Sequence, residues 1–243
     1  SAATVTSMSA SATEIKVMSG GAPKEVFAQL TPIFEQQTGN KVVFVYDVLT
    51  ALREKIAAGE KADVLVMPVP MLDGYIKDGK LRANSESTFG TVGISVVVKQ
   101  GAPQPDISTK EKFREAMLSA RSIVHATPGK TPSGTHMGKV MEQLGIADAV
   151  AKKVVHRPAL EGGVQLVAEG QADIGIYPAS EVANVKGVTI VGSLPAGIEL
   201  NIVYGGAATA DSAAGEAAAA FVKFMAAPEN RSVWKHAGFD PPR

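Results

Sequence analysis

Three turns of this chain combine glycine with hydroxyl or carboxyl side chains directly before a predicted helix. They are Ser19-Gly20-Gly21-Ala22, Thr131-Pro132-Ser133-Gly134-Thr135 and Leu160-Glu161-Gly162-Gly163. The first N–H groups of a helix have no partner inside the helix, and the helix dipole places partial positive charge there. Such a turn can hold an anion without a charged side chain. Each turn also fits ordinary helix capping, and both interpretations stay open at this point.

Side chains suited to acid–base, nucleophilic or metal chemistry do not form a motif. The chain has no cysteine, which excludes thiol catalysis, thiolate metal sites and disulfides. The histidines lack the spacing of metal ligands; they are His125, His136, His156 and His236. Ser133 lies close to His136 in sequence, but no Gly-x-Ser-x-Gly elbow surrounds it. We therefore predict no metal, no cofactor and no catalytic residue.

The elements that position these turns alternate between strand and helix. The first turn separates an apolar run at residues 14–18 from an amphipathic helix that starts at Pro23 and ends at Gly39-Asn40. Strands at 42–46 and 62–67 follow, with a helix at 50–58 between them. This alternation predicts a mainly parallel sheet with helices on both faces.

The rest of the chain repeats this scheme. Helices are predicted at residues 109–119, from the Pro-Ser-Gly turn through 144, over 160–170, at 212–226 and in a terminal segment at 221–239. Strands are predicted at 122–126, near 154, at 172–177 and at 188–191. A strand is also predicted at 94–99, and two segments, residues 89–91 and 200–205, are candidates to cross between two halves of the molecule.

Length and composition narrow the function classes. A chain of 243 residues can form one large domain or two of about 100 residues. Lys plus Arg equals Asp plus Glu at 24 each and only 5% of residues are aromatic, so we predict no binding to nucleic acid. No apolar run is long enough to span a membrane. Residues 1–13 are small and polar, as in a disordered leader left after signal-peptide removal, although a frayed terminus fits equally well.

In the order and spacing of its segments, the chain resembles the type II periplasmic solute-binding proteins of ABC importers, closest to the molybdate-binding branch. The segments are IKVMSGGAPKEVF, LREKIAAGEKADVLV, GISVVVKQG, TPSGTHMGKVMEQLG, ALEGGVQLVAEGQADIGIY and AFVKFMAAPENRSVWKHAGF. The resemblance implies an α/β fold of two lobes, each a mainly parallel sheet flanked by helices, joined by two crossing strands. Lobe 1 would hold residues 14–90 and 202–243, lobe 2 residues 93–199, with the hinge near 90–93 and 199–202.

The resemblance also implies a ligand held between the lobes. The ligand-binding residues that it implies are Ser19, Gly20, Gly21, Ala22, Thr50, Ser133, Gly134, Thr135, Glu161, Gly162 and Tyr177. Ala22 stands where the family usually presents a serine hydroxyl. Asp47 would repel a dianion if it faced the cleft, and a helix cap is the alternative role for it.

These departures weaken the expectation of molybdate binding, because each unsatisfied donor or acceptor costs about 1–3 kcal/mol. A small organic acid or polar metabolite fits better. The candidate counter-charges are Lys24, Arg53, Lys130 and Arg157.

We predict a monomeric, extracytoplasmic receptor, periplasmic after signal-peptide removal, that binds a small anion by hinge closure. Its partners would be the small-molecule ligand and the membrane permease of an ABC importer, and it would not be an enzyme. The alternative is an isomerase-like enzyme that acts on a small organic acid and is built on the same fold. Such an enzyme needs a base beside its substrate. The candidates for that base are Asp47, Glu161, His136 and Tyr177.

Overall fold

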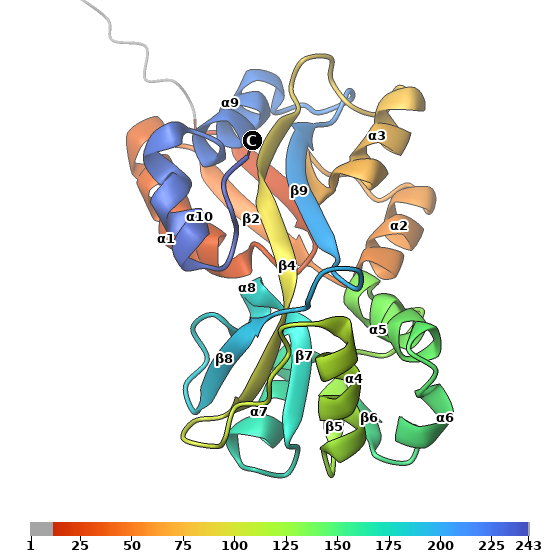
Figure 1. Cartoon of the computed structure of the whole chain (residues 1–243). Coiled ribbons are helices and arrows are strands. Elements are labelled where there is room, and N and C mark those ends of the chain that lie inside the picture. The colour runs from red at the N-terminus through yellow and green to blue at the C-terminus, as the bar shows by residue number, and fades with distance from the viewer. Residues whose placement is uncertain (1–11, 243) are drawn as a thin grey trace, which may run out of the picture.

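The computed structural model describes residues 12–242, so residues 1–11 of the predicted leader and Arg243 lie outside the described residues. Within residues 12–242, nine strands form one mixed sheet, with α-helices packed on its faces (Figure 1). The strand order is β2-β1-β3-β9-β4-β7-β5-β6, and β8 also pairs with β4. The fold is the α/β architecture that the sequence predicts. No helix in this range is both long and apolar enough to cross a bilayer.

The upper half of the molecule in Figure 1 contains the N-terminal alternation of strand and helix. Its elements are β1 (Glu14–Ser19), α1 (Lys24–Thr38), β2 (Lys41–Tyr46), α2 (Leu49–Ala57), β3 (Val64–Pro68) and α3 (Val69–Lys77). Strand β1 lies between β2 and β3 and pairs with both in parallel. Gly39 ends α1 in a left-handed conformation with φ of 74°.

The lower half repeats this pattern around shorter strands. Its elements are α4 (Lys110–Ser119), β5 (Ile123–His125), α5 (Pro132–Gln143), α6 (Ala147–Val150), β6 (Val154–His156), the 3-10 helix η1 (Ala159–Glu161), α7 (Gly163–Ala168), β7 (Ile174–Pro178), α8 (Ala179–Val182) and β8 (Val188–Ser193). Strand β5 pairs in parallel with β6 and β7.

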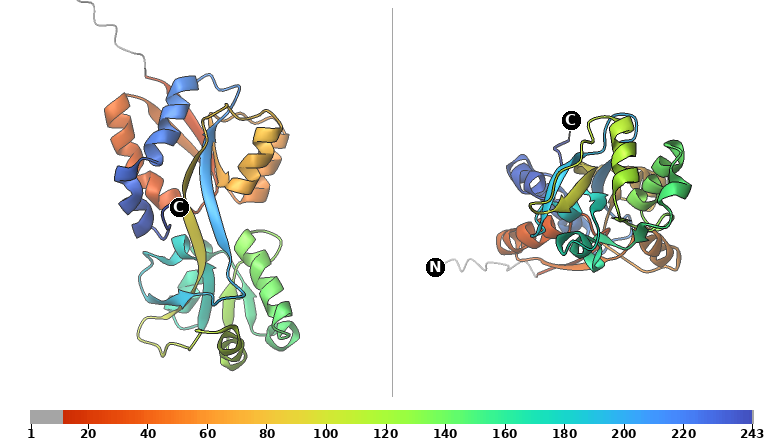
Figure 2. Two further views of the ribbon diagram at one scale, coloured as in Figure 1. Left: turned by 45° about the horizontal axis from the view of Figure 1, so that its top comes forward. Right: turned by 60° about the horizontal axis from the view of Figure 1, so that its bottom comes forward.

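Two long strands connect the halves. β4 (Ser87–Lys99) and β9 (Asn201–Ala208) pair antiparallel, and β4 continues into the lower half, where it pairs with β7 and β8 (Figure 2). The register shifts between Thr88 and Gly90. The sequence predicts both crossings, and the strands are longer than expected. The predicted lobe boundaries and hinge positions, near residues 90–93 and 199–202, remain a proposal.

The two halves have different cores. Aromatic rings dominate the upper core, where Trp234 stacks on Phe89 with ring centroids 4.9 Å apart and its Nε1 donates to the carbonyl of Met225 at 2.8 Å. The lower core is built mainly from aliphatic side chains and methionines, and its aromatic members among the described residues are Phe113 and Tyr177. Trp234 thus anchors the C-terminal segment to the upper half.

The prediction of a single terminal helix over residues 221–239 is wrong. Helix α9 (Gly215–Met225) ends before a 3-10 turn, η2 (Pro228–Asn230), and a separate helix α10 (Arg231–His236) follows. The reason is Pro228, because the residue before a proline is disfavoured in the helical conformation. Ala227 is accordingly extended, with φ of −61° and ψ of 143°.

Candidate functional site

The carboxyl ends of the parallel strands of both halves point toward the boundary between them. Pro68 at the end of β3 pairs with Tyr204 near the start of β9, and Pro178 at the end of β7 pairs with Ile94 of β4. The loops that follow β1, β2, β5, β6 and β7 therefore meet at this boundary. These loops and the helix starts after them carry the predicted ligand residues.

The β1–α1 turn offers backbone groups rather than side chains. Ser19 is fully buried, and its hydroxyl donates to the carbonyl of Gly20 at 2.7 Å. The N–H of Gly20 donates to the carbonyl of Val66 at 3.2 Å. Helix α1 starts without a side-chain cap, and the space beside Gly21 is open for at least 4 Å. The N–H groups at the start of α1 are thus the donors that this turn can present.

The β2–α2 loop carries Asp47 and leads to Thr50. The Oδ1 atom of Asp47 accepts the N–H of Val48 at 2.8 Å, and Val48, not Asp47, is the N-cap residue of α2. Thr50 is exposed on the first turn of α2. Asp47 therefore stabilises the loop locally.

The β5–α5 turn satisfies its own donors. Thr131 caps α5 by accepting the N–H of Gly134 at 3.0 Å, and the hydroxyl of Thr135 accepts the N–H of Gly129 at 2.8 Å. The hydroxyl of Ser133 is 3.4 Å from that of Thr131, and Ser133 is buried. Only glycine fits at position 134, because a Cβ there would lie 2.7 Å from the carbonyl oxygen of Ala126.

The β6–α7 loop and Tyr177 support each other. Tyr177 is fully buried, and its hydroxyl donates to the carbonyl of Arg157 at 2.8 Å and packs against Gly163. Gly162 takes a left-handed φ of 103°, which favours glycine, and Glu161 before it is exposed. The hydroxyl of Tyr177 therefore holds this loop in place.

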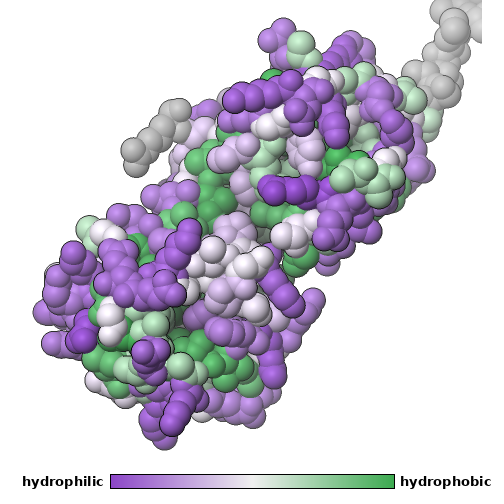
Figure 3. All heavy atoms as spheres, turned by 90° about the vertical axis from the view of Figure 1, so that its right-hand side faces the viewer, coloured by the Kyte–Doolittle hydropathy of each residue, from purple (hydrophilic) through white to green (hydrophobic). Residues whose placement is uncertain are grey.

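A pocket of about 340 Å³ lies between the halves, where α2 stands above α5 (Figure 1). Its lining comes from both halves and from the segment before β9: Leu49, Thr50, Arg53, Met71, Gly129, Lys130, Thr131, Pro132, Thr135, His136, Lys139 and Leu200. Figure 3, which faces the side of α2 and α5, shows two rounded parts of the molecule joined by a narrower region.

The pocket is rich in positive charge. Arg53 comes from α2 of the upper half, whereas Lys130 and Lys139 come from the lower half. None of the three forms an ion pair within residues 12–242. The sequence suggests Arg53 and Lys130 as counter-charges but not Lys139, which only the packing of α5 against α2 brings to the pocket. The pocket thus places three cations next to the predicted contacts Thr50 and Thr135.

Tyr204 on β9 lines the same boundary, and the sequence analysis does not single it out. A Cβ built on Gly20 would lie 3.8 Å from the Tyr204 hydroxyl oxygen, which places that hydroxyl beside the β1–α1 turn. Tyr204 is 6% exposed, and no described residue forms a hydrogen bond with its hydroxyl. Burial raises the pKa of Tyr204, so the hydroxyl stays protonated and can donate to a ligand.

Glu181 on α8 is the second residue that the sequence analysis misses. It is partly exposed, and it forms no hydrogen bond or ion pair within the described range. Burial raises the pKa of the Glu181 carboxyl group from 4.5 to about 7. Its negative charge also contributes to the raised pKa values of Tyr177 and Tyr204, so its carboxyl group lies near both rings. Its short helix shows no sequence signal for this position.

The halves touch directly on the α8 side. The Nδ2 atom of Asn184 donates to Glu25 Oε1 of α1 at 2.9 Å and to the carbonyl of His236 of α10 at 3.3 Å. Gly238 packs on α8, since a Cβ there would lie 2.8 Å from the carbonyl oxygen of Ala179. The boundary is therefore in contact at α8 and hollow at α2 and α5.

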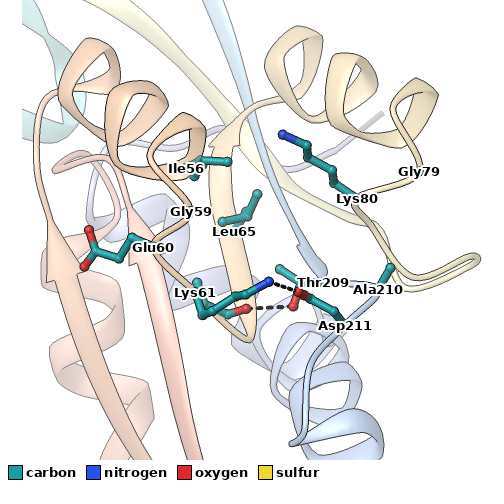
Figure 4. A pocket seen from close by; sticks show the side chains of 11 residues that line it. Ile56, Gly59, Glu60, Lys61, Leu65, Gly79, Lys80, Thr209, Ala210 and Asp211 are labelled. Atoms are coloured by element: carbon teal, nitrogen blue, oxygen red, sulfur yellow. Dashed lines mark hydrogen bonds and ion pairs between the residues drawn. The ribbon is translucent and has the colours of Figure 1, made fainter.

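Another pocket, of about 360 Å³, lies at the C-terminal end of β9, away from the boundary between the halves (Figure 4). Thr209 and Lys80 line it, and its Lys61 forms an ion pair with Asp211 across the opening. Both carboxylates that line it, Glu60 and Asp211, form ion pairs with lysines, whereas no carboxylate lines the pocket between the halves. Within residues 12–242, no group of three or more His, Asp or Glu side chains is arranged to hold a metal ion.

Residues 15–240 match the family of bacterial extracellular solute-binding proteins, and the chain belongs to this family. It has the type II solute-binding fold. Among solved structures it is similar to a substrate-binding domain assigned to a molybdenum ABC transporter of Clostridium difficile, with a TM-score of 0.77 and 15% identity over 96% of this chain and 100% of that one. The periplasmic molybdate-binding protein of Azotobacter vinelandii gives a TM-score of 0.75 and 21% identity over 94% and 100%. At these identities the likeness shows the fold alone.

The chain is also similar to an aconitate isomerase from a Pseudomonas species. The two are 28% identical over 235 residues, which cover 94% of this chain and 88% of that protein. This relative is named as an enzyme, whereas the family and both structural neighbours are described as binding proteins.

Proposed function

We propose that this chain is an extracytoplasmic receptor that captures a small organic anion with two or three carboxylate groups and delivers it to the permease of an ABC importer. The observation that carries this proposal is the set of three cations around the pocket between the halves, none of them in an ion pair with a described residue. Like charges held this close repel one another. A polycarboxylate in the pocket would offset that repulsion from both halves at once.

The geometry of the donors supports the same ligand class. Arg53 has a planar guanidinium suited to bidentate contact with a carboxylate, and Lys130 and Lys139 approach from the other side of the pocket. A volume of about 340 Å³ fits a small metabolite.

The boundary between the halves supplies fewer neutral hydrogen-bond donors than a tetrahedral oxyanion such as molybdate needs. Such an oxyanion is commonly held by neutral donors without counter-charge. In this chain the Ser19 hydroxyl donates its proton to the carbonyl of Gly20, and Ala22 has no hydroxyl, so the β1–α1 turn offers an oxyanion no side-chain donor. The hydroxyls of Thr131 and Thr135 accept backbone N–H groups and keep their own protons. The relative named aconitate isomerase supports a tricarboxylate, because aconitate carries three carboxylates on a three-carbon chain.

Titration calorimetry tests the ligand class. We expect trans-aconitate, cis-aconitate or the saturated propane-1,2,3-tricarboxylate to bind, and molybdate and sulfate to bind at least tenfold more weakly. Lys139→Ala removes a charge-assisted contact worth about 1.5–3 kcal/mol, so affinity should fall at least tenfold. Lys152→Ala, at an exposed lysine outside the pocket, is the matched control and should leave affinity unchanged.

Two results would contradict the proposal. Binding of molybdate without binding of any polycarboxylate would show that the pocket cations do not set the ligand class. Equal affinities of the Lys139→Ala and Lys152→Ala variants would show that the ligand lies elsewhere.

A second candidate function is isomerisation of the bound tricarboxylate. The name of the 28% identical relative favours it, since interconversion of the two aconitate isomers can proceed by moving one proton along a three-carbon allylic unit. Incubation of cis-aconitate with the protein, followed by proton NMR, would detect the trans isomer. Stoichiometric binding without conversion would leave the receptor as the function.

A further inference from the structure

We infer that Tyr204 is a ligand-binding residue, whose hydroxyl takes one carboxylate of the ligand at the start of α1 together with the backbone N–H groups of Gly21 and Ala22. The inference rests on the proposed function, because it takes the polycarboxylate from it. It adds a second contact region beside the cation-lined pocket. Neither the predicted contacts nor the lining of that pocket includes Tyr204.

The Tyr204 side chain is buried, yet its hydroxyl has no partner. Tyr204 is 6% exposed, and its ring packs edge-on against that of Phe239 with centroids 5.9 Å apart. No described residue forms a hydrogen bond with its hydroxyl, although a buried hydroxyl normally has a partner. The fully buried side-chain oxygens that lack a partner within residues 12–242 belong to Thr31 and Ser180. The Tyr204 oxygen is not one of these, so it is still accessible and can donate to a ligand.

This hydroxyl lies between the β1–α1 turn and the rest of the boundary. A Cβ built on Gly20 would lie 3.8 Å from the Tyr204 hydroxyl oxygen and 3.1 Å from Cδ2 of Leu49. Leu49 is the first residue of α2, and it lines the pocket between the halves. Through Gly20, the Tyr204 hydroxyl is therefore adjacent to a side chain that bounds this pocket.

The turn beside the hydroxyl has two free backbone donors. The N–H groups of Gly20 and Lys24 donate to nearby carbonyls, whereas those of Gly21 and Ala22 have no partner among the described residues. Gly21 is exposed, and a Cβ built on it would meet nothing within 4 Å. Helix α1 has 15 residues and no side-chain cap, so partial positive charge at its start adds attraction for an anion.

Two N–H groups and one O–H group match a carboxylate, whose oxygens accept about four hydrogen bonds. Burial raises the pKa of Tyr204, so the hydroxyl keeps its proton and donates it. The side chains of the turn itself supply no such donor, because Ala22 has no hydroxyl and that of Ser19 donates to the carbonyl of Gly20. Tyr204 thus supplies from β9 the hydroxyl that the turn lacks.

The boundary therefore offers a ligand two kinds of contact. Cations surround the pocket at α2 and α5, and neutral donors lie at the start of α1. A short carbon chain with a carboxylate at each end can contact both regions, whereas a monocarboxylate can contact only one of them. Tyr204 would thus contribute to selection of ligands with more than one carboxylate.

The Tyr204→Phe variant tests the hydroxyl, because it keeps the ring and its packing. In titration calorimetry at pH 6, its affinity for propane-1,2,3-tricarboxylate should be at least tenfold below that of the wild type, since a hydrogen bond to a charged group is lost. Burial gives Glu181, whose charge acts on Tyr204, a pKa of about 7, so at pH 6 that carboxyl group is mostly neutral. Tyr75→Phe, on α3 and outside the pocket between the halves, is the matched control and should bind as the wild type does.

Two further measurements separate a ligand contact from a structural role. The melting temperature of the free Tyr204→Phe variant should equal that of the wild type, because the hydroxyl has no partner to lose. In a nitrogen-15 NMR titration of the wild type with the tricarboxylate, the amide protons of Gly21 and Ala22 should move downfield, because a carboxylate accepts them.

The outcomes distinguish this inference from the proposed function. Equal affinities of Tyr204→Phe and the wild type, with weaker binding by Lys139→Ala, would overturn the inference and leave the proposed function intact. Amide protons of Gly21 and Ala22 that do not move at saturating tricarboxylate would also overturn it. A Tyr204→Phe variant that loses stability in the free state as well as affinity would show a structural role instead. Failure of every polycarboxylate to bind would overturn the proposed function, and this inference with it.

Discussion

Helices α1 and α5 begin at the boundary from opposite halves, and their first turns differ. At α5, the hydroxyls of Thr131 and Thr135 accept two backbone N–H groups, and Gly134 packs against carbonyl oxygens of the preceding loop. At α1 there is no side-chain cap, and the space beside Gly21 is open. The turn that is richer in hydroxyls thus uses them to cap its own helix. In the turn with Ala22 in place of the expected serine, the N–H groups of Gly20 and Lys24 donate to carbonyls, and those of Gly21 and Ala22 have no partner among the described residues.

This difference teaches that residue types alone do not identify ligand donors. A threonine hydroxyl that accepts a local N–H group at a helix start still keeps its own proton, so its geometry, and not its residue type, decides whether it can donate to a ligand. In this chain the lower half contributes charge to the pocket through Lys130 and Lys139, and the upper half contributes Arg53.

Alanine substitutions of glycine should give the largest difference in stability between the two turns. Gly134→Ala forces a Cβ into contact with the carbonyl oxygens of Ala126 and Thr127, which are backbone atoms that cannot move cheaply. We expect the free energy of unfolding to fall by about 3 kcal/mol, the upper range for overpacking. Gly21→Ala meets nothing within 4 Å and should change it by less than about 0.5 kcal/mol. Urea denaturation measures both, and similar losses for the two variants would contradict the packing argument.

The stability of the protein should depend on pH through Glu181 of α8. The pKa of Glu181 is about 7 in the folded protein and 4.5 when unperturbed, so its favourable contribution is complete below pH 4.5 and is lost as pH rises through 7. Glu181→Gln stays neutral at all pH values. We therefore expect the variant to be more stable than wild type by about 2–3 kcal/mol at pH 8 and about equal at pH 4. A difference that does not change between these pH values would show that Glu181 is not desolvated.

Removal of a helix cap should give the smallest effect. Thr131→Ala loses the hydrogen bond to the N–H of Gly134, and we expect a loss of about 1 kcal/mol in unfolding free energy. Ser133→Ala is the matched control, because Ser133 caps nothing and its hydroxyl lies 3.4 Å from that of Thr131. A larger loss for Ser133→Ala would show that its buried hydroxyl, not the cap, stabilises the turn.

Much of the fold could be predicted from local patterns. The continuous apolar run of β3, the glycine that ends α1 and the helix start at Pro132 each carry their signal within a few residues. The break between α9 and α10 also has a local cause at Pro228, which the prediction of one terminal helix overlooked. Element ends and the full length of β4 depend on pairing with distant strands, so local sequence patterns do not determine them.

The site depends more on distant contacts. Tyr204 reaches the β1–α1 turn only through the register of β9 with β3, in which it pairs with Pro68. The hydroxyl of Tyr177 finds its acceptor 20 residues earlier in the chain, at Arg157. Glu181 shows no motif, because its raised pKa comes from the packing of α8 between the halves. The predicted ligand contacts remain predictions until a ligand is identified.

The contact of Asn184 with α1 and α10 has a kinetic consequence. Because the halves are in contact at α8, we expect a ligand of the proposed pocket to enter on the α2–α5 side, past Arg53, Lys130 and Lys139. Positive charge at such an opening attracts anions during diffusion, and salt screens that attraction. The association rate should therefore fall with rising ionic strength much more than the dissociation rate changes. Contact between the halves at α8 thus leaves the cation-lined side open, and we expect this to raise the association rate of an anionic ligand.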